Sequence, residues 1–181
     1  MLRSDLPFKI SIVSVPNILA TKLISDYTQQ DTRKSNMGQA TISYTKKMSI
    51  DTFPIELHLR LISYGGQDIH KRLRTYQGSL GMIYIYEKGD LVSFKEIISD
   101  FLIFQDIYKS TNSYPFFLGI ERQPSQENMI KILEYVKKYG LNYKDVNITN
   151  FLSFDQFLRS IIINSQIFEA TTQGSCDINT Q

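Results

Sequence analysis

The chain has 181 residues, which is enough for one domain with a sizeable apolar core. Hydrophobic residues make up 42% and charged residues 21% of it, values that are ordinary for a soluble globular protein. The 20 basic and 18 acidic residues leave a net charge of only +2, which argues against nucleic acid as the partner. We expect the short basic cluster at residues 70–74 to be a solvated helix face.

Nothing in the sequence predicts attachment to a membrane. No apolar run approaches the roughly 20 residues that cross a bilayer. The N-terminus lacks a signal-peptide core and a myristoylation glycine, and Cys176 does not belong to a prenylation box, so we expect no lipid anchor. Because Cys176 is the single cysteine, no intrachain disulfide can form, and we expect a reducing, cytoplasmic setting.

The first half of the chain predicts strands and helices in alternation. Residues 8–15 are apolar and β-branched, which predicts a buried first strand that ends at Pro16. A helix is expected over residues 19–27, followed by a polar loop. Two strands of alternating polarity are expected over residues 40–50 and 53–62, and the two-residue turn between them makes this pair antiparallel. Two adjacent glycines then precede a basic helix.

The second half continues the alternation. A strand is expected over residues 82–86, and Ser93 is expected to cap a long helix that reaches residue 108. Pro115 opens a short strand at residues 116–118. The remaining expected elements are a helix over 125–139, a strand over 141–148 and a helix over 151–167.

The order of these elements predicts one α/β domain over residues 1–170. We expect a three-layer sandwich, with a six-stranded, mainly parallel sheet containing one antiparallel strand and with helices on both faces. Residues 171–181 form a polar tail that we expect to be disordered. In such folds ligands bind beyond the carboxyl ends of the strands, so a functional site is expected there.

Three segments resemble the Ras and Rab small GTPases. Residues 81–94, GMIYIYEKGDLVSF, are similar to the G-A-I-L-V-Y-D-x-x-D-x-x-S-F stretch of that family without a gap. Gly66 and Gln67 resemble the G-Q of its D-T-A-G-Q-E motif, and residues 116–119 resemble the strand that leads into N-K-x-D. The resemblance spans residues 8–168 and implies the small-GTPase fold, which is related to the P-loop NTPases.

The resemblance aligns the family's phosphate loop, G-x-x-x-x-G-K-[ST], with residues 14–21, SVPNILAT. Backbone N–H groups of that loop cradle the phosphates, and its lysine neutralises the β and γ charges. In this chain the segment contains no glycine, Ala20 takes the position of the lysine, and Pro16 has no N–H to donate. Thr21, at the magnesium-ligand position, is the one match that remains.

The metal and base motifs are altered as well. Ser63 takes the position of the D-x-x-G aspartate, and its neutral hydroxyl is a weaker ligand for Mg²⁺ than a carboxylate. Thr41 matches the switch threonine, although a threonine in such a β-rich segment is more often an ordinary strand residue. The guanine-reading N-K-x-D becomes IERQ at residues 120–123, and S-A-K becomes NIT at 147–149. Gln67, whose family counterpart orients the attacking water, has nothing to orient without phosphate and metal.

Losing the lysine and the metal aspartate together removes most of the electrostatic stabilisation on which phosphoryl transfer depends. We therefore interpret the chain as a pseudo-GTPase with no catalytic residue, cofactor or metal, which acts as a protein-interaction subunit of a larger assembly. The region that corresponds to the switches is the candidate contact surface, because tyrosine and arginine are favoured at interfaces. Its candidate residues are Tyr44, Tyr64, Arg72, Arg74 and Tyr76.

Two alternatives stay open. The chain could be a divergent small GTPase that binds GTP or GDP with Mg²⁺ and hydrolyses it slowly as a trafficking or signalling switch. The residues of that residual site would be Thr21, Thr41, Gly66 and Gln67. In the other alternative, the remodelled pocket holds a different small molecule, or is closed by the apolar side chains of Ile18, Leu19 and Ile120.

Overall fold

The computed structural model describes seven stretches of the chain, residues 8–15, 17–30, 41–63, 69–110, 114–120, 126–146 and 151–165. The expected tail at residues 171–181 lies outside the described residues. So do Tyr64, Gly66 and Gln67.

The described residues form six strands and five helices in the order expected from the sequence. The strands are β1 (Phe8–Val15), β2 (Thr41–Ile50), β3 (Phe53–Ser63), β4 (Gly81–Glu87), β5 (Tyr114–Ile120) and β6 (Asn142–Val146). The helices are α1 (Asn17–Thr28), α2 (Ile69–Tyr76), α3 (Leu91–Ser110), α4 (Gln126–Tyr139) and α5 (Phe151–Ile163).

The six strands form a single sheet in the order β2-β3-β1-β4-β5-β6. β2 and β3 are antiparallel, with Ile50 opposite Phe53 across a two-residue turn. The other neighbouring strands are parallel. The expected six-stranded, mainly parallel sheet with one antiparallel strand is therefore confirmed.

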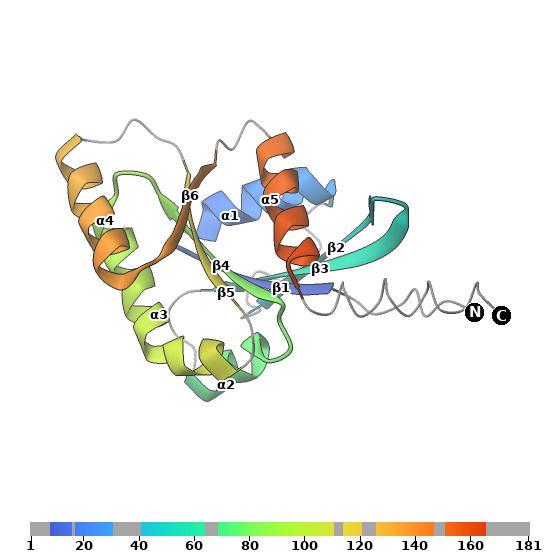
Figure 1. Ribbon diagram of the computed structural model, residues 1–181, viewed down its shortest axis with the longest axis horizontal. Coiled ribbons are helices and arrows are strands. Elements are labelled where there is room, and N and C mark those ends of the chain that lie inside the picture. The colour runs from blue at the N-terminus through green and yellow to red at the C-terminus, as the bar shows by residue number, and fades with distance from the viewer. Residues whose placement is uncertain are drawn as a thin grey trace.

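Helices cover both faces of this sheet and bury a separate core on each (Figure 1). α1 and α5 cover one face, and we call the apolar cluster beneath them the α1/α5 core. α2, α3 and α4 cover the other face, above what we call the α2–α4 core. Successive strand residues point to opposite faces, so Ile12 lies in the first core and Val13 in the second. The two central strands, β1 and β4, are buried on both faces, which explains their nearly continuous apolar sequences.

Two helix starts differ from the sequence-based expectation. α1 begins at Asn17, two residues before the expected start, and only residue 16 separates it from β1. At α3 the capping residue is Asp90 instead of Ser93, because the Asp90 carboxylate accepts hydrogen bonds from the N–H groups of Val92 (2.9 Å) and Ser93 (3.3 Å). The Ser93 hydroxyl donates back to the Asp90 carbonyl at 3.2 Å.

Among the described residues, no helix combines the length and the apolar character needed to cross a bilayer.

Candidate functional site

The carboxyl ends of β1 and β3 form the part of the sheet edge where a ligand site is expected. These strands are neighbours, and β1 leads into α1 on one face while β3 leads into α2 on the other. Such a reversal in winding direction creates a crevice, which is where open α/β sheets bind ligands. Ser14 and Ser63 are register partners at this edge, and Thr41 pairs with Ile62 beside them. The structure thus brings three of the aligned family positions together.

The segment aligned with the phosphate loop does not form a loop in this structure. Its first two residues, Ser14 and Val15, complete β1, and residues 17–21 are the first five residues of α1. A phosphate loop surrounds its ligand with successive N–H groups that are free of helical hydrogen bonds. Here the N–H of Thr21 already lies within the helix, where its partner is a carbonyl one turn earlier.

Ala20, at the lysine position, is turned away from the sheet edge. It is 0% exposed and belongs to the α1/α5 core together with Leu23, Ile24 and Tyr27. These four residues recur at the spacing of one helical face, so the apolar periodicity of α1 fixes the direction in which position 20 points. Thr21 is half-buried, and Lys22 is exposed on the outer side of the helix.

The apolar side chains expected to close the pocket behave differently from one another. Ile18 is 73% exposed, so it does not close a pocket. Leu19 and Ile120 both pack into the α1/α5 core. The expectation that all three fill the former ligand site is therefore wrong for Ile18, because the first turn of α1 directs that side chain outward.

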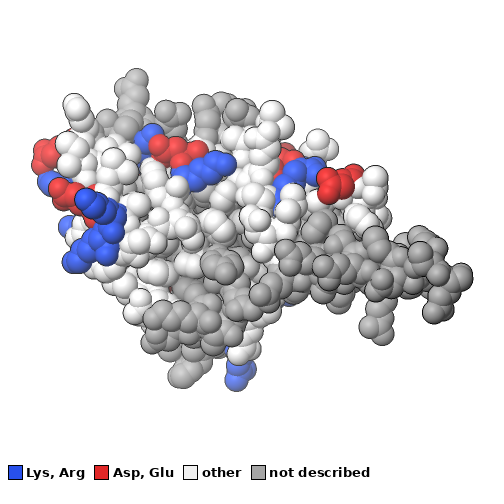
Figure 2. Space-filling model, viewed as in Figure 1, with Lys and Arg blue, Asp and Glu red and all other residues white. Residues whose placement is uncertain are grey.

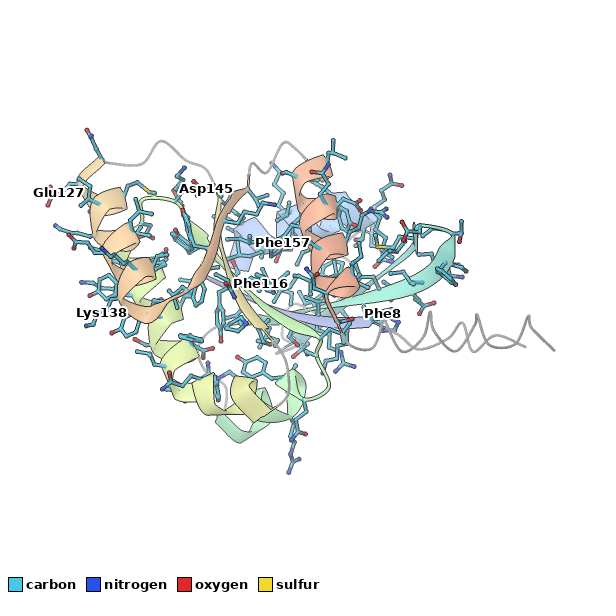
Figure 3. All side chains as sticks on the ribbon, in the orientation of Figure 1. Phe8, Phe116, Glu127, Lys138, Asp145 and Phe157 are labelled. Carbon is cyan, nitrogen blue, oxygen red and sulfur yellow. The ribbon has the colours of Figure 1, made fainter. Side chains whose placement is uncertain are left out.

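A polar network that the sequence did not reveal occupies the carboxyl ends of β4, β5 and β6. The Tyr143 hydroxyl donates to one oxygen of Asp145, and the Lys88 ammonium lies 2.7 Å from the other. Asp145 lies on the last strand near its carboxyl end (Figure 3). Burial raises the pKa of Tyr143, and the hydrogen bond to Asp145 raises it further, so the hydroxyl stays protonated at neutral pH.

Gly119 allows this network to form. A Cβ built at Gly119 would lie 2.9 Å from both the Asp145 Oδ1 and the Tyr143 hydroxyl, and 3.2 Å from the Tyr86 hydroxyl. With glycine at this position, polar groups from β4 and β6 converge over β5 without being displaced by a side chain. The aligned guanine-reading residues at 121–123 and 147–149 lie outside the described residues.

The five residues proposed as a contact surface do not share one environment. Tyr44 is 2% exposed in the α1/α5 core and Tyr76 is 4% exposed in the α2–α4 core, so neither side chain is available to a partner in this conformation. Arg72 forms an ion pair with Asp100. Arg74 is exposed, and Tyr64 lies outside the described residues. Tyrosine and arginine also stabilise cores and buried ion pairs, and their residue type alone did not separate these roles.

Within the described ranges, no three His, Cys, Asp or Glu side chains are grouped closely enough to hold a metal ion. No protein-family model matches this chain, and no curated protein is significantly similar to it.

Proposed function

We propose that this chain has the architecture of a small GTPase without its nucleotide machinery and that it acts as a non-catalytic protein-interaction subunit of a larger assembly. The fold half of the proposal is supported by the resemblance of residues 81–94 and by the sheet order, in which the aligned positions Ser14, Ser63 and Thr41 meet at one edge.

One observation carries the loss of nucleotide binding. Ala20, the residue of α1 that is aligned with the lysine, is fully buried in the α1/α5 core, and a single residue separates β1 from α1. A triphosphate carries several negative charges, which a site stabilises with a cationic side chain, free N–H groups and a metal. Alanine at position 20 supplies no cation, and the early start of α1 leaves only one residue for a loop that would supply free N–H groups.

The alternative, a divergent GTPase, is favoured by the placement of two threonines. Thr21 is half-buried in the first turns of α1, and Thr41 begins β2 at the same edge. Both hydroxyls would be metal ligands if Mg²⁺ and a nucleotide bound there.

The melting temperature with and without magnesium and millimolar GTP or GDP separates the two functions, because a ligand stabilises the native state by mass action. We expect no shift relative to magnesium alone. A shift of several degrees that the Thr21→Ala variant abolishes would establish the divergent GTPase instead. Thr28→Ala, in the last turn of the same helix, is the matched control, because it removes a hydroxyl far from the sheet edge.

The proposed role as a protein-interaction subunit is tested at Arg74, which is exposed on the candidate surface. We expect the native protein to co-purify with a defined partner in constant ratio, and Arg74→Glu to weaken that association. Lys138→Glu makes the same charge change on α4, where acidic and basic groups are intermixed (Figure 2), and is expected to leave the association intact. A partner that dissociates equally from both variants would reject this surface.

A further inference from the structure

Asp100 is a buried carboxylate surrounded by hydrogen-bond donors from two other elements. It lies in α3, its side chain is 0% exposed, and it forms an ion pair with Arg72 of α2, whose side chain is 14% exposed. Its second oxygen accepts hydrogen bonds from the hydroxyls of Tyr76 in α2 (3.2 Å) and Tyr84 in β4 (3.4 Å). A carboxylate that loses water on burial needs such donors to remain favourable in the folded state.

The same two α2 residues also contact an aromatic ring of α3. The Tyr76 and Phe104 rings meet edge to face, with centroids 5.1 Å apart. The Arg72 guanidinium lies over the Phe104 ring, 5.3 Å from its centroid. Arg72 and Tyr76 lie four positions apart, so both project from one side of α2 toward α3. Ionic, hydrogen-bonding and aromatic contacts therefore act on the same pair of helices.

The end of α2 is held independently by β1. The Lys9 ammonium donates to the carbonyls of Thr75 (2.6 Å) and Gln77 (2.5 Å), which lie where α2 ends. A cation at this position satisfies carbonyls that have no partner within the helix. Beyond it, the hydroxyls of Ser11 and Ser79 are 2.7 Å apart.

We propose that a clamp centred on Asp100 holds α2 against α3 in a single position, so that α2 is a fixed part of the fold and does not respond to a ligand at the sheet edge. The contacts that support this join α2 to α3 and to β1, and none of them involves the edge formed by β1 and β3. The inference therefore does not depend on the proposed function. The clamp could be present whether or not the protein binds nucleotide, and its absence would not show that nucleotide binds.

Two conservative variants test the clamp. Tyr76→Phe and Tyr84→Phe each remove one hydroxyl that donates to the same oxygen of Asp100, but only Tyr76 belongs to α2. We expect Tyr76→Phe to speed amide hydrogen exchange at residues 73–76 by about fivefold, the usual worth of one such bond. We expect Tyr84→Phe to leave the exchange of these amides within about twofold of the unaltered protein. Equal effects of the two variants, or no effect of either, would overturn the proposal.

A stronger perturbation removes the charge itself. Asp100→Asn leaves the partly buried Arg72 without its counter-ion, and we expect exchange at residues 73–76 to rise at least about tenfold, while the α1 amides change less. Glu127→Gln is the matched control, because it breaks the solvent-exposed Glu127–Lys131 pair on α4. If Asp100→Asn unfolds the whole protein, Tyr76→Phe and Tyr84→Phe still test whether the clamp exists. If Mg²⁺ and GTP shift the melting temperature of the unaltered protein, they should still leave exchange at residues 73–76 unchanged, and faster or slower exchange there would also overturn the clamp.

Discussion

Tyr86 and Asp145 flank Gly119 in one row across three neighbouring strands. Gly119 is the register partner of Tyr86 on β4 and of Asp145 on β6. All three positions point to the face covered by α2, α3 and α4, so the bare glycine leaves room above β5 for the polar groups on either side. This row closes the carboxyl ends of β4–β6 with the protein's own side chains.

The row predicts that Gly119→Ala is destabilising. The added methyl group would contact Asp145 and Tyr143 at 2.9 Å, and moving these side chains breaks their hydrogen bond and the ion pair to Lys88. We expect a loss of about 1–3 kcal/mol in the free energy of unfolding, measured by urea denaturation. In an Asp145→Ala background the same substitution should cost less, because one of the crowded groups is gone. An equal cost in both backgrounds would mean that the strain lies elsewhere.

Lys9 predicts a pH dependence of stability. Burial, together with the nearby positive charge of Arg60, lowers the pKa of Lys9 from 10.5 to about 8 in the folded protein. Between these two values the Lys9 side chain binds more protons in the unfolded chain than in the folded protein, so its contribution to the free energy of unfolding should rise with pH across this window. Below about pH 8 the lysine is protonated in both states and contributes no slope. The control is Lys9→Met, which should lack this contribution. The free energy of unfolding is measured against pH for both proteins by urea denaturation, and parallel curves would contradict the prediction.

Asp155 links α5 to α1 and β2. It accepts hydrogen bonds from the Tyr27 hydroxyl (2.5 Å) and from Arg159, whose guanidinium also donates to the carbonyl of Ser49. Burial works to raise the pKa of Asp155, but the bonds from Arg159 and Tyr27 outweigh it and lower the pKa. We expect Asp155→Ala to cost about 1–3 kcal/mol in the free energy of unfolding, because the buried Tyr27 hydroxyl loses its acceptor. Thermal or urea unfolding measures this.

The control for Asp155 is Glu127→Ala, which removes a carboxylate from a solvent-exposed pair and should change the free energy of unfolding much less. The contribution of Asp155 should also fade as pH falls through its lowered pKa, because protonation ends the ion pair. Similar costs for the two alanine variants would show that the Asp155 network contributes no more than a surface pair.

Gln29 has a backbone conformation that glycine adopts more easily. It follows the last residue of α1 with φ of 57°, the left-handed conformation common just after a helix. We expect Gln29→Gly to raise the free energy of unfolding by up to about 1 kcal/mol, because it relieves the crowding of Cβ. Asp26→Gly, at an exposed position inside the same helix, should lower it by about the same amount. The two changes in the free energy of unfolding, measured by urea denaturation, should have opposite signs. A loss of stability in both variants would show that the backbone of Gln29 is not strained.

Much of the fold could be predicted from the sequence because the signals involved are local. The β-branched run at residues 8–15, the two-residue turn after Ile50 and the apolar periodicity of residues 125–139 each identified an element without knowledge of its neighbours. The absence of glycine and lysine from residues 14–21 could also be read directly from the sequence. The capping residue of α3 was not, since Asp90 and Ser93 both suit the first turn of a helix and only the hydrogen bonds distinguish them.

What the sequence by itself determined is the set of strands and helices and their order along the chain. Only the tertiary structure decided that Tyr44 and Tyr76 are buried and that Asp100 joins two helices. The physical reason is that these outcomes depend on strand order and register. Apart from the pairing of β2 with β3, both are set by the packing of segments that lie far apart in the chain, and a local sequence pattern does not identify those partners.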